Sequence, residues 1–429
     1  MHPPASADAE ASELVVQRAV RRAERAVYVV FGAAGLSMST WASRIPQVRD
    51  HFQLSPRALG FVLLAVACGS LVSLPLAGPL VARTGSRQVV GAMALLFGSG
   101  VAMVAIGYQV GLAMVVAGLV TMGFAAGAWD VAMNVQGAFV EQLLGRSVMA
   151  RFHAGFSLGT VVGAAIGVGM VAAEVSVTVH LLAAGVVIAT SAVALSRRFV
   201  ADHARASHGT EHPVQHTVQH TVEHTVEHTV EPLPRRGHFA AWREPRTLLI
   251  GLFVLAFAFA EGVGNDWIAV AAIDGYGTSE AVGTVVFACF LVAMTAGRWF
   301  GPMLLDRHGR AAVVRVAALV ALAGALLFVT APYAWLAVVG ALFWGLGTSL
   351  GFPVGMSAGA DEPAFAAGRV SVISSIGYCA FLVGPPLIGF LGDRFTVLSA
   401  LTAVVVLMAL AAVLAPIVQA PPSPAANGD

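Results

Sequence analysis

The sequence predicts an all-α polytopic membrane protein, with twelve transmembrane helices in two pseudo-symmetric six-helix bundles. Composition is the first observation: 58% of the 429 residues are apolar and only 11% are charged, whereas about a quarter of the residues in a soluble chain are charged. The second is a series of apolar stretches, each long enough to cross a hydrocarbon core about 30 Å thick. These spans run over 26–45, 58–80, 88–108, 111–138, 151–173, 179–197, 247–271, 281–303, 312–331, 333–355, 369–391 and 396–418.

The distribution of arginine predicts how these spans are oriented. Arginines precede the first span, lie between spans two and three, four and five, and eight and nine, open span eleven, and recur in the central segment. All these segments fall on one side of the predicted membrane, and the other side has only Arg49, Arg57 and Arg394. Because basic residues gather on the cytoplasmic side of membrane proteins, we expect both termini and the central segment in the cytoplasm.

An internal repeat divides the chain into two halves. The sequence GPLVARTGSR (78–87) after span two parallels GPMLLDRHGR (301–310) after span eight, and Gly123 in span four corresponds to Gly345 in span ten. Matched halves of this kind predict a binding site near mid-membrane, where the halves meet. The predicted domains are a cytoplasmic N-terminal segment (1–25), a first bundle (26–198), a cytoplasmic low-complexity linker (199–246), a second bundle (247–418) and a cytoplasmic tail (419–429).

Four ionisable residues lie inside spans that otherwise consist of apolar residues. A charge at bilayer depth costs roughly 3 kcal/mol or more, so it is retained mostly where it faces a polar cavity. We therefore expect the transport chemistry at these positions. One alternative is a structural ion pair between the arginine and the acid of span four. Another is that the two acids of span seven, the second above all, lie near the periplasmic surface, solvated and inert. The four residues are Arg44, Asp130, Glu261 and Asp266.

Helical spacing predicts which polar side chains lie together in the first half. Asp130 and Asn134 are four residues apart, so they share one face of span four. Trp41 and Arg44 are three apart near the end of span one, which also places them on one face. Carboxylates accept hydrogen bonds from sugar hydroxyls, and an aromatic face stacks on a sugar ring. Burial also disfavours a charged carboxylate, which suits proton coupling.

Span seven of the second half carries a similar set. Glu261 and Asn265 share a face, and Asp266 lies about 140° around the helix from Glu261. Trp267 corresponds to Trp41 in the repeat. The two sets together predict a lumen with aromatic rings, an amide and carboxylates, which suits a polar ligand such as a sugar.

The loop after span eight is similar to a motif of the major facilitator superfamily. The residues Asp306-Arg307-His308-Gly309-Arg310 match its D-R-x-G-R core, and the matching loop of the first half carries Arg83, Gly85 and Arg87, with Ala82 in place of the usual acid. The resemblance covers nearly the whole chain beyond the termini and linker. It implies alternating access, with these loops as a latch on the cytoplasmic side that is weakened in the first half.

Within the superfamily, the chain resembles the fucose-permease-like branch of bacterial inner-membrane proteins. The Asp130-x-x-x-Asn134 spacing, Ile45-Pro46-Gln47 after span one, and His153 in span five carry this resemblance. One departure is Ala42, which stands where the branch has an acid. The resemblance implies a multi-pass protein of the inner plasma membrane, with protons as a candidate coupling ion. A solvated histidine at the helix start is the alternative for His153.

These observations favour a secondary active transporter of a small, sugar-like polar solute. Proton-coupled efflux of drugs or metabolites is the alternative within the same superfamily. An enzyme is disfavoured because no hydrolase, metalloprotease or nucleotide-binding motif occurs. We expect no cofactor, no metal and no nucleic-acid partner, and a monomer in contact with the lipid bilayer. The histidine repeat from His212 to Glu231 could bind a transition metal, but its Thr and Val content favours a linker without helix.

Overall fold

A computed structural model describes residues 7–146, 148–202, 240–362 and 365–420, which form helices and no strands. Twelve of the described helical segments are long and apolar enough to cross a membrane. The first half consists of α1 (Ala7–Ala42), α2 (Ile45–His51), α3 (Pro56–Thr84), α4 (Ser86–Val110), α5 (Leu112–Leu144), α6 (Met149–Ala172) and α7 (Val177–Ser196). The second half consists of η1 (Ala240–Arg243), α9 (Pro245–Tyr276), α10 (Glu280–His308), α11 (Arg310–Thr330), α12 (Ala334–Thr348), α13 (Gly351–Gly359), α14 (Ala366–Arg394), α15 (Val397–Ala400), α16 (Thr402–Leu414) and η2 (Ala415–Val418).

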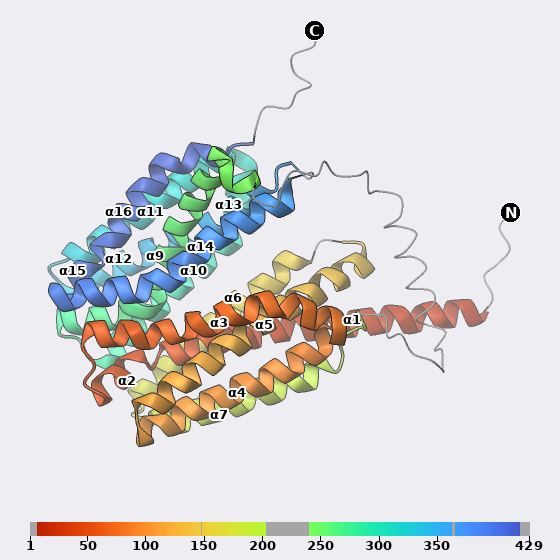
Figure 1. Cartoon of the computed structure of the whole chain (residues 1–429), viewed down its shortest axis with the longest axis horizontal. Coiled ribbons are helices and arrows are strands. Elements are labelled where there is room, and N and C mark those ends of the chain that lie inside the picture. The colour runs from red at the N-terminus through yellow and green to blue at the C-terminus, as the bar shows by residue number, and fades with distance from the viewer. Residues whose placement is uncertain (1–6, 147, 203–239, 363–364, 421–429) are drawn as a thin grey trace, which may run out of the picture.

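The two halves form two helical bundles that lie side by side (Figure 1). They meet at the end that carries α2 and α15, which we call the α2 side, and diverge toward the opposite end. That opposite end carries residues 199–202 and η1, next to the central segment, and we call it the linker side. Contacts between the bundles run mainly through α3 with α14 and α6 with α10.

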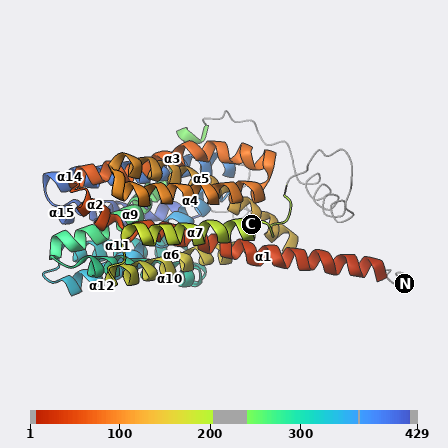
Figure 2. The same ribbon diagram turned by 90° about the horizontal axis from the view of Figure 1, so that it is seen from below.

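The predicted spans match the helices in number, and several boundaries differ. The helix α1 begins at Ala7 and extends past the other helices on the linker side (Figure 2), so span one is longer than 26–45. It ends at Ala42, and a short turn at Ser43 and Arg44 separates it from α2. Spans ten and twelve are each broken into shorter helices, α12 with α13 and α15 with α16. The linker repeat and most of the tail lie outside the described residues.

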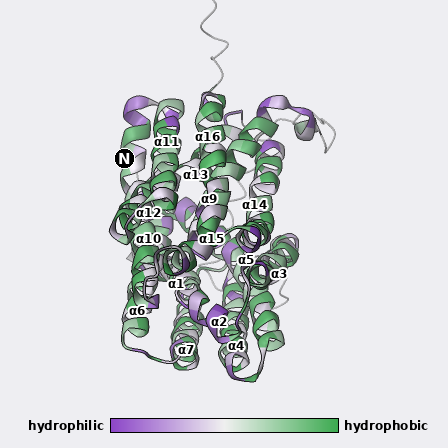
Figure 3. Cartoon of the chain, turned by 90° about the vertical axis from the view of Figure 1, so that its left-hand side faces the viewer, coloured by the Kyte–Doolittle hydropathy of each residue, from purple (hydrophilic) through white to green (hydrophobic). Residues whose placement is uncertain are grey.

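The outer surface of the bundles is apolar, as a bilayer requires. In Figure 3 hydrophobic colour covers most of the helices, and hydrophilic colour marks α2. Large apolar side chains are exposed along α3, α7 and α16, among them Val72, Val186 and Val413. Because a lipid tail is as apolar as these side chains, their exposure costs nothing in a membrane.

The internal repeat is visible in equivalent close contacts. A Cβ added to Gly123 would lie 2.0 Å from the carbonyl oxygen of Val66, where α5 packs on α3. A Cβ on Gly345 would lie 2.2 Å from the carbonyl oxygen of Phe290, where α12 packs on α10. The correspondence of these two glycines is therefore confirmed, and in both halves glycine lets a pair of helices approach closely.

The arginine-containing loops of the two halves also share one backbone conformation. A single glycine joins α3 to α4 and α10 to α11: Gly85 has φ 84° and ψ 152°, and Gly309 has φ 79° and ψ 158°. These positive φ values favour glycine over every other residue. The backbone conformation of these short loops therefore explains why the motif has glycine at positions 85 and 309.

Gly159 provides a test of helix packing. An added Cβ there would meet the carbonyl oxygen of Gly32 at 2.0 Å, whereas a Cβ on Gly169 of the same helix meets nothing within 4 Å. We expect Gly159→Ala to destabilise the first bundle by about 1–3 kcal/mol, since overpacking forces α1 and α6 apart. Thermal unfolding in detergent measures the loss. Gly169→Ala is the matched control, and equal melting temperatures for both variants would contradict the packing role.

Candidate functional site

Polar side chains from both bundles face one another, within the central parts of α5, α9, α10 and α14 and close to the start of α6. Two pairs approach across the bundles closely enough to interact electrostatically: Asp130 of α5 with Tyr378 of α14, and His153 of α6 with Arg298 of α10. With the neighbours of these side chains they form what we call the central polar cluster. Its members are Asp130, Asn134, His153, Glu261, Arg298 and Tyr378.

Asp130 is an exposed carboxylate with an amide neighbour and no cation. Its Oδ1 atom lies 3.3 Å from Nδ2 of Asn134, which also donates to the Asp130 carbonyl oxygen at 2.8 Å. The predicted shared face of Asp130 and Asn134 is therefore present. No ion pair of Asp130 occurs among the described residues. The alternative pairing with Arg44 is not formed, because Arg44 has other partners.

Glu261 is held by an ion pair inside the second bundle. Its Oε1 atom accepts from Nη2 of Arg298 at 2.6 Å, and the side chains are 16% and 27% exposed. Arg298 lies within α10, and its guanidinium is held by Glu261 of α9 inside the second bundle. Arg298 and Tyr378 were missed as candidate residues. The signal for Arg298 was present, since it is a charge inside span eight, whereas one tyrosine in span eleven carries no comparable signal.

Arg44 lies away from this cluster, on the α2 side. It is 2% exposed, and its Nε atom donates to Nδ1 of His180 at 2.8 Å, while Nη2 donates to the carbonyl oxygen of Val175 at 3.0 Å. Arg44 and Trp41 do not share a helix face, because α1 ends at Ala42 and Arg44 is the N-cap of α2. Arg44 thus connects the end of α1 to α7 in this conformation.

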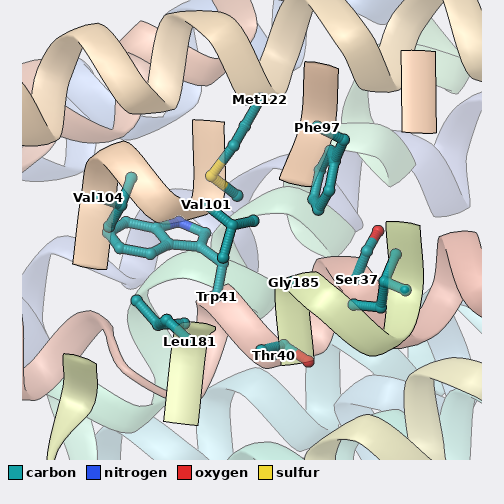
Figure 4. A pocket seen from close by; sticks show the side chains of 10 residues that line it. Ser37, Thr40, Trp41, Phe97, Val101, Val104, Met122, Leu181 and Gly185 are labelled. Carbon is teal, nitrogen blue, oxygen red and sulfur yellow. The ribbon is translucent and has the colours of Figure 1, made fainter. Parts of the chain in front are cut away.

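Trp41 points into the first bundle, away from the second. Its ring borders a cavity of about 10 Å³ with Phe97, Met122 and Leu181 (Figure 4). This volume holds about one water molecule, so the cavity is too small for a sugar. In this conformation the ring packs among apolar side chains.

The polar residues that follow Glu261 in α9 are enclosed by the second bundle. Asn265 is 5% exposed and neither polar atom of its amide has a hydrogen-bond partner. Trp267 is fully buried with its Nε1 atom unpartnered. Asp266 is partly buried, and no ion pair for it occurs in the described part of the chain. Native proteins leave few buried polar groups unpaired, so this stretch is a candidate for new contacts in another conformation.

Polar contacts between the bundles close the α2 side. Gln47 Nε2 donates to Glu280 Oε2 at 2.6 Å, and Arg49 Nη1 donates to Asp274 Oδ2 at 2.6 Å. Both donors lie on α2, and both acceptors lie in or near the α9–α10 connection. The turn at Ser43 and Arg44 therefore positions a short helix, α2, that reaches from the first bundle to the second.

The predicted latch residues on the linker side do not meet in this conformation. Arg310 pairs with Asp361 at 2.7 Å within the second bundle. The side chains of Arg83, Arg87, Asp306 and Arg307 are exposed, and no ion pair for them occurs among the described residues. The linker-side ion pairs Arg146–Glu24, Arg246–Asp361, Arg310–Asp361, Arg369–Glu244 and Arg369–Glu362 each stay within one bundle. In this conformation polar contacts join the bundles on the α2 side, and these linker-side pairs do not join them.

Two matched bundles around a polar cluster, closed at one end, form the architecture of a secondary transporter. Residues 27–379 match the Major Facilitator Superfamily, and the chain belongs to that family. The expected family and the expected fold are both confirmed.

Similar proteins support this membership. The uncharacterized transporter y4wD of Sinorhizobium fredii is 32% identical over 396 residues, which cover 92% of this chain and 98% of that protein. The crystal structure of the nucleoside transporter NupG superposes with a TM-score of 0.68 at 14% identity, covering 93% of this chain and 98% of NupG. The Escherichia coli fucose:proton symporter FucP gives a TM-score of 0.58 at 14% identity, covering 92% of this chain and 98% of FucP. At these identities the two structures establish the fold alone.

Proposed function

We propose that this protein is a secondary active transporter that moves a small, sugar-like polar solute with protons. The observation that carries the proposal is the central polar cluster, in which acids, an amide and a tyrosine from both bundles face one another. A solute held there would touch both bundles, so that closing one side and opening the other carries it across. The structural neighbours NupG, a nucleoside transporter, and FucP, a fucose:proton symporter, agree with a hydroxylated solute.

The two central acids, Asp130 and Glu261, differ in their partners, and this difference supports Asp130 as the proton carrier. Glu261 lies 2.6 Å from the guanidinium of Arg298, which stabilises its charged form. Asp130 has an amide neighbour and no cation among the described residues, so its charge is less compensated. A proton on Asp130 removes an isolated charge from a membrane interior, whereas a proton on Glu261 breaks an ion pair.

We propose that the linker side faces the cytoplasm and that the protein lies in the inner membrane. The arginines of the predicted cytoplasmic segments support this orientation, and with it the present conformation is inward-open. Cysteine labelling tests the orientation: a cysteine at Arg198 should react in inverted vesicles, and one at Gln53 should react in intact cells. The reverse pattern would overturn the assignment.

Solute uptake into proteoliposomes tests the function itself. A panel of radiolabelled sugars, polyols, sugar acids and nucleosides is offered under an imposed pH gradient, inward and outward in separate runs. We expect accumulation of at least one member above that of protein-free liposomes, and its loss when a protonophore collapses the gradient. Equal retention in both kinds of liposome for every compound would argue against this function. The direction of accumulation separates uptake from the alternative of efflux.

The linker-side loops give a further prediction about the gate. When the bundles close there, Asp306 and Arg310 should meet Arg83 and Arg87 where little water remains, so their attraction is weakly screened. Ala82→Asp restores the missing carboxylate and should shift the population toward a closed linker side, whereas Asp306→Asn should shift it toward the open state. Spin labels at Arg197 and His308 measure the change. Identical distance distributions in both variants and the parent would mean that helix packing alone sets this gate.

A further inference from the structure

A cavity of about 490 Å³ on the linker side of the first bundle is lined mainly by arginine. Its wall consists of Arg21, Glu24 and Arg25 of α1, Leu144 at the end of α5, and Arg146 just beyond it. Cavities of this volume are in the range of small-molecule sites. We call this cavity, with these five residues, the arginine vestibule.

Three arginines and one glutamate line the arginine vestibule, so its lining carries a net positive charge. Its one carboxylate, Glu24, is already bonded to Arg146 through Nη2 at 2.8 Å. Arg21 and Arg25 are exposed and have no ion-pair partner among the described side chains. They are four residues apart on one helix, an arrangement in which like charges repel. An anion between them would relieve that repulsion.

One wall of the vestibule, Leu144, lies on the same face of α5 as Asp130. Leu144 follows Asp130 by fourteen residues, and the spacing 130, 134, 141, 144 keeps one face of α5. At 1.5 Å per residue, Leu144 lies about 21 Å nearer the linker side on the same face as Asp130. A solute that moves along this face of α5 between the linker side and Asp130 passes the vestibule.

The general enrichment of arginine on the cytoplasmic side accounts for the number of arginines on α1. It does not account for the fact that some of them line one cavity together with Arg146. Arg18 and Arg22 satisfy that bias equally well and line no part of the cavity. Arg146 comes from a different element and completes a concave surface with Arg21 and Arg25. A cleft lined by one sign of charge concentrates ions of the opposite sign.

We propose that the arginine vestibule captures anions on the linker side and that the transported solute is a hydroxylated organic anion, such as a sugar acid. This inference rests on the proposed function and narrows its substrate class. The central polar cluster accommodates such a solute. Asn134 and Tyr378 offer hydrogen bonds to hydroxyls, and only one nitrogen of Arg298 is used by Glu261. Within the central polar cluster, a proton on Asp130 removes the negative charge that has no cation beside it, so anion and proton bind together.

The charge of the vestibule is tested without knowledge of the substrate. In a chain whose three cysteines are replaced by serine, a neutral fluorophore is attached through Leu144→Cys, and its quenching by iodide and by caesium is compared. We expect the double variant Arg21→Gln, Arg25→Gln to lower iodide quenching about threefold at low salt and to raise caesium quenching. The matched control Arg18→Gln, Arg22→Gln removes the same charge from the same helix outside the cavity lining, and it should have a clearly smaller effect on both. Equal effects of the two double variants would overturn the capture site.

The substrate class is tested with the solute panel in proteoliposomes. We expect the accumulated compounds to carry a carboxylate, and their neutral counterparts (galactose for galacturonate, glucitol for gluconate) to remain at background. The Arg21, Arg25 variant should raise the half-saturation concentration from the linker side several-fold at low salt, with the difference vanishing at high salt. Accumulation of neutral solutes alone, unaffected by that variant, would refute the anion class and leave the proposed transport function intact. If no solute accumulates, the proposed function and the substrate class both fail, whereas the quenching result still decides the vestibule.

Discussion

Asp130→Asn is expected to abolish proton-driven accumulation while solute exchange continues. Asparagine keeps the size and the hydrogen bond to Asn134 but cannot take up a proton. A pH step of about one unit is worth about 1.4 kcal/mol per proton, which is a tenfold accumulation for a coupled carrier. In the variant we expect an accumulation ratio of about one, with counterflow of labelled against unlabelled solute still present. The half-saturation concentration for the solute should also become independent of pH.

Two acids serve as controls for Asp130. Glu261→Gln leaves Arg298 unpaired inside the membrane, so we expect weaker binding or a less stable protein rather than selective loss of coupling. Asp266→Asn changes a second acid that has no ion pair among the described residues, and it should retain the tenfold ratio. If Asp130→Asn accumulates solute normally while Asp266→Asn does not, the proton site lies in α9.

The sequence was sufficient to predict the fold because the bilayer imposes its own length and polarity rules. Twelve apolar spans and a repeated glycine-arginine loop specify two bundles, and Gly123 and Gly345 prove to be equivalent in their contacts. The shared face of Asp130 and Asn134 also follows from helical spacing alone, since both lie within one continuous helix.

Ion pairs between side chains of different helices could not be predicted from helical spacing. Spacing says nothing about which charge on α10 meets an acid on α9, so the bond of Arg298 to Glu261 was missed. The prediction for Arg44 assumed that span one continues through position 44, and the turn before Pro46 moved its side chain to His180. Orientation within a bundle also depends on the neighbouring helices, which is why Trp41 faces a small apolar cavity.

Arg49→Glu is expected to open the α2 side. In the structure Arg49 lies between two carboxylates, with Nε 2.6 Å from Asp50 and Nη1 2.6 Å from Asp274 of the other bundle. A carboxylate at position 49 replaces this attraction by repulsion among three acids. Because Asp274 is 40% exposed, screening by water reduces the effect, and we take about 2 kcal/mol. That amount shifts the equilibrium between the two conformations roughly thirtyfold toward the open α2 side.

Spin labels at Gln53 and Arg394 measure the opening, since both positions are exposed on the α2 side and belong to different bundles. We expect a longer distance in Arg49→Glu and a return toward the parent distance when Asp274→Arg is added, because the exchanged charges attract again. Arg57→Glu makes the same change in charge at an exposed neighbouring position without an ion pair among the described residues, and it should leave the distance unaltered. A distance that changes equally in both single variants would assign the effect to net charge on this surface. A distance that changes in neither would mean that the α3–α14 and α6–α10 packing, with the Gln47–Glu280 bond, holds the α2 side closed on its own.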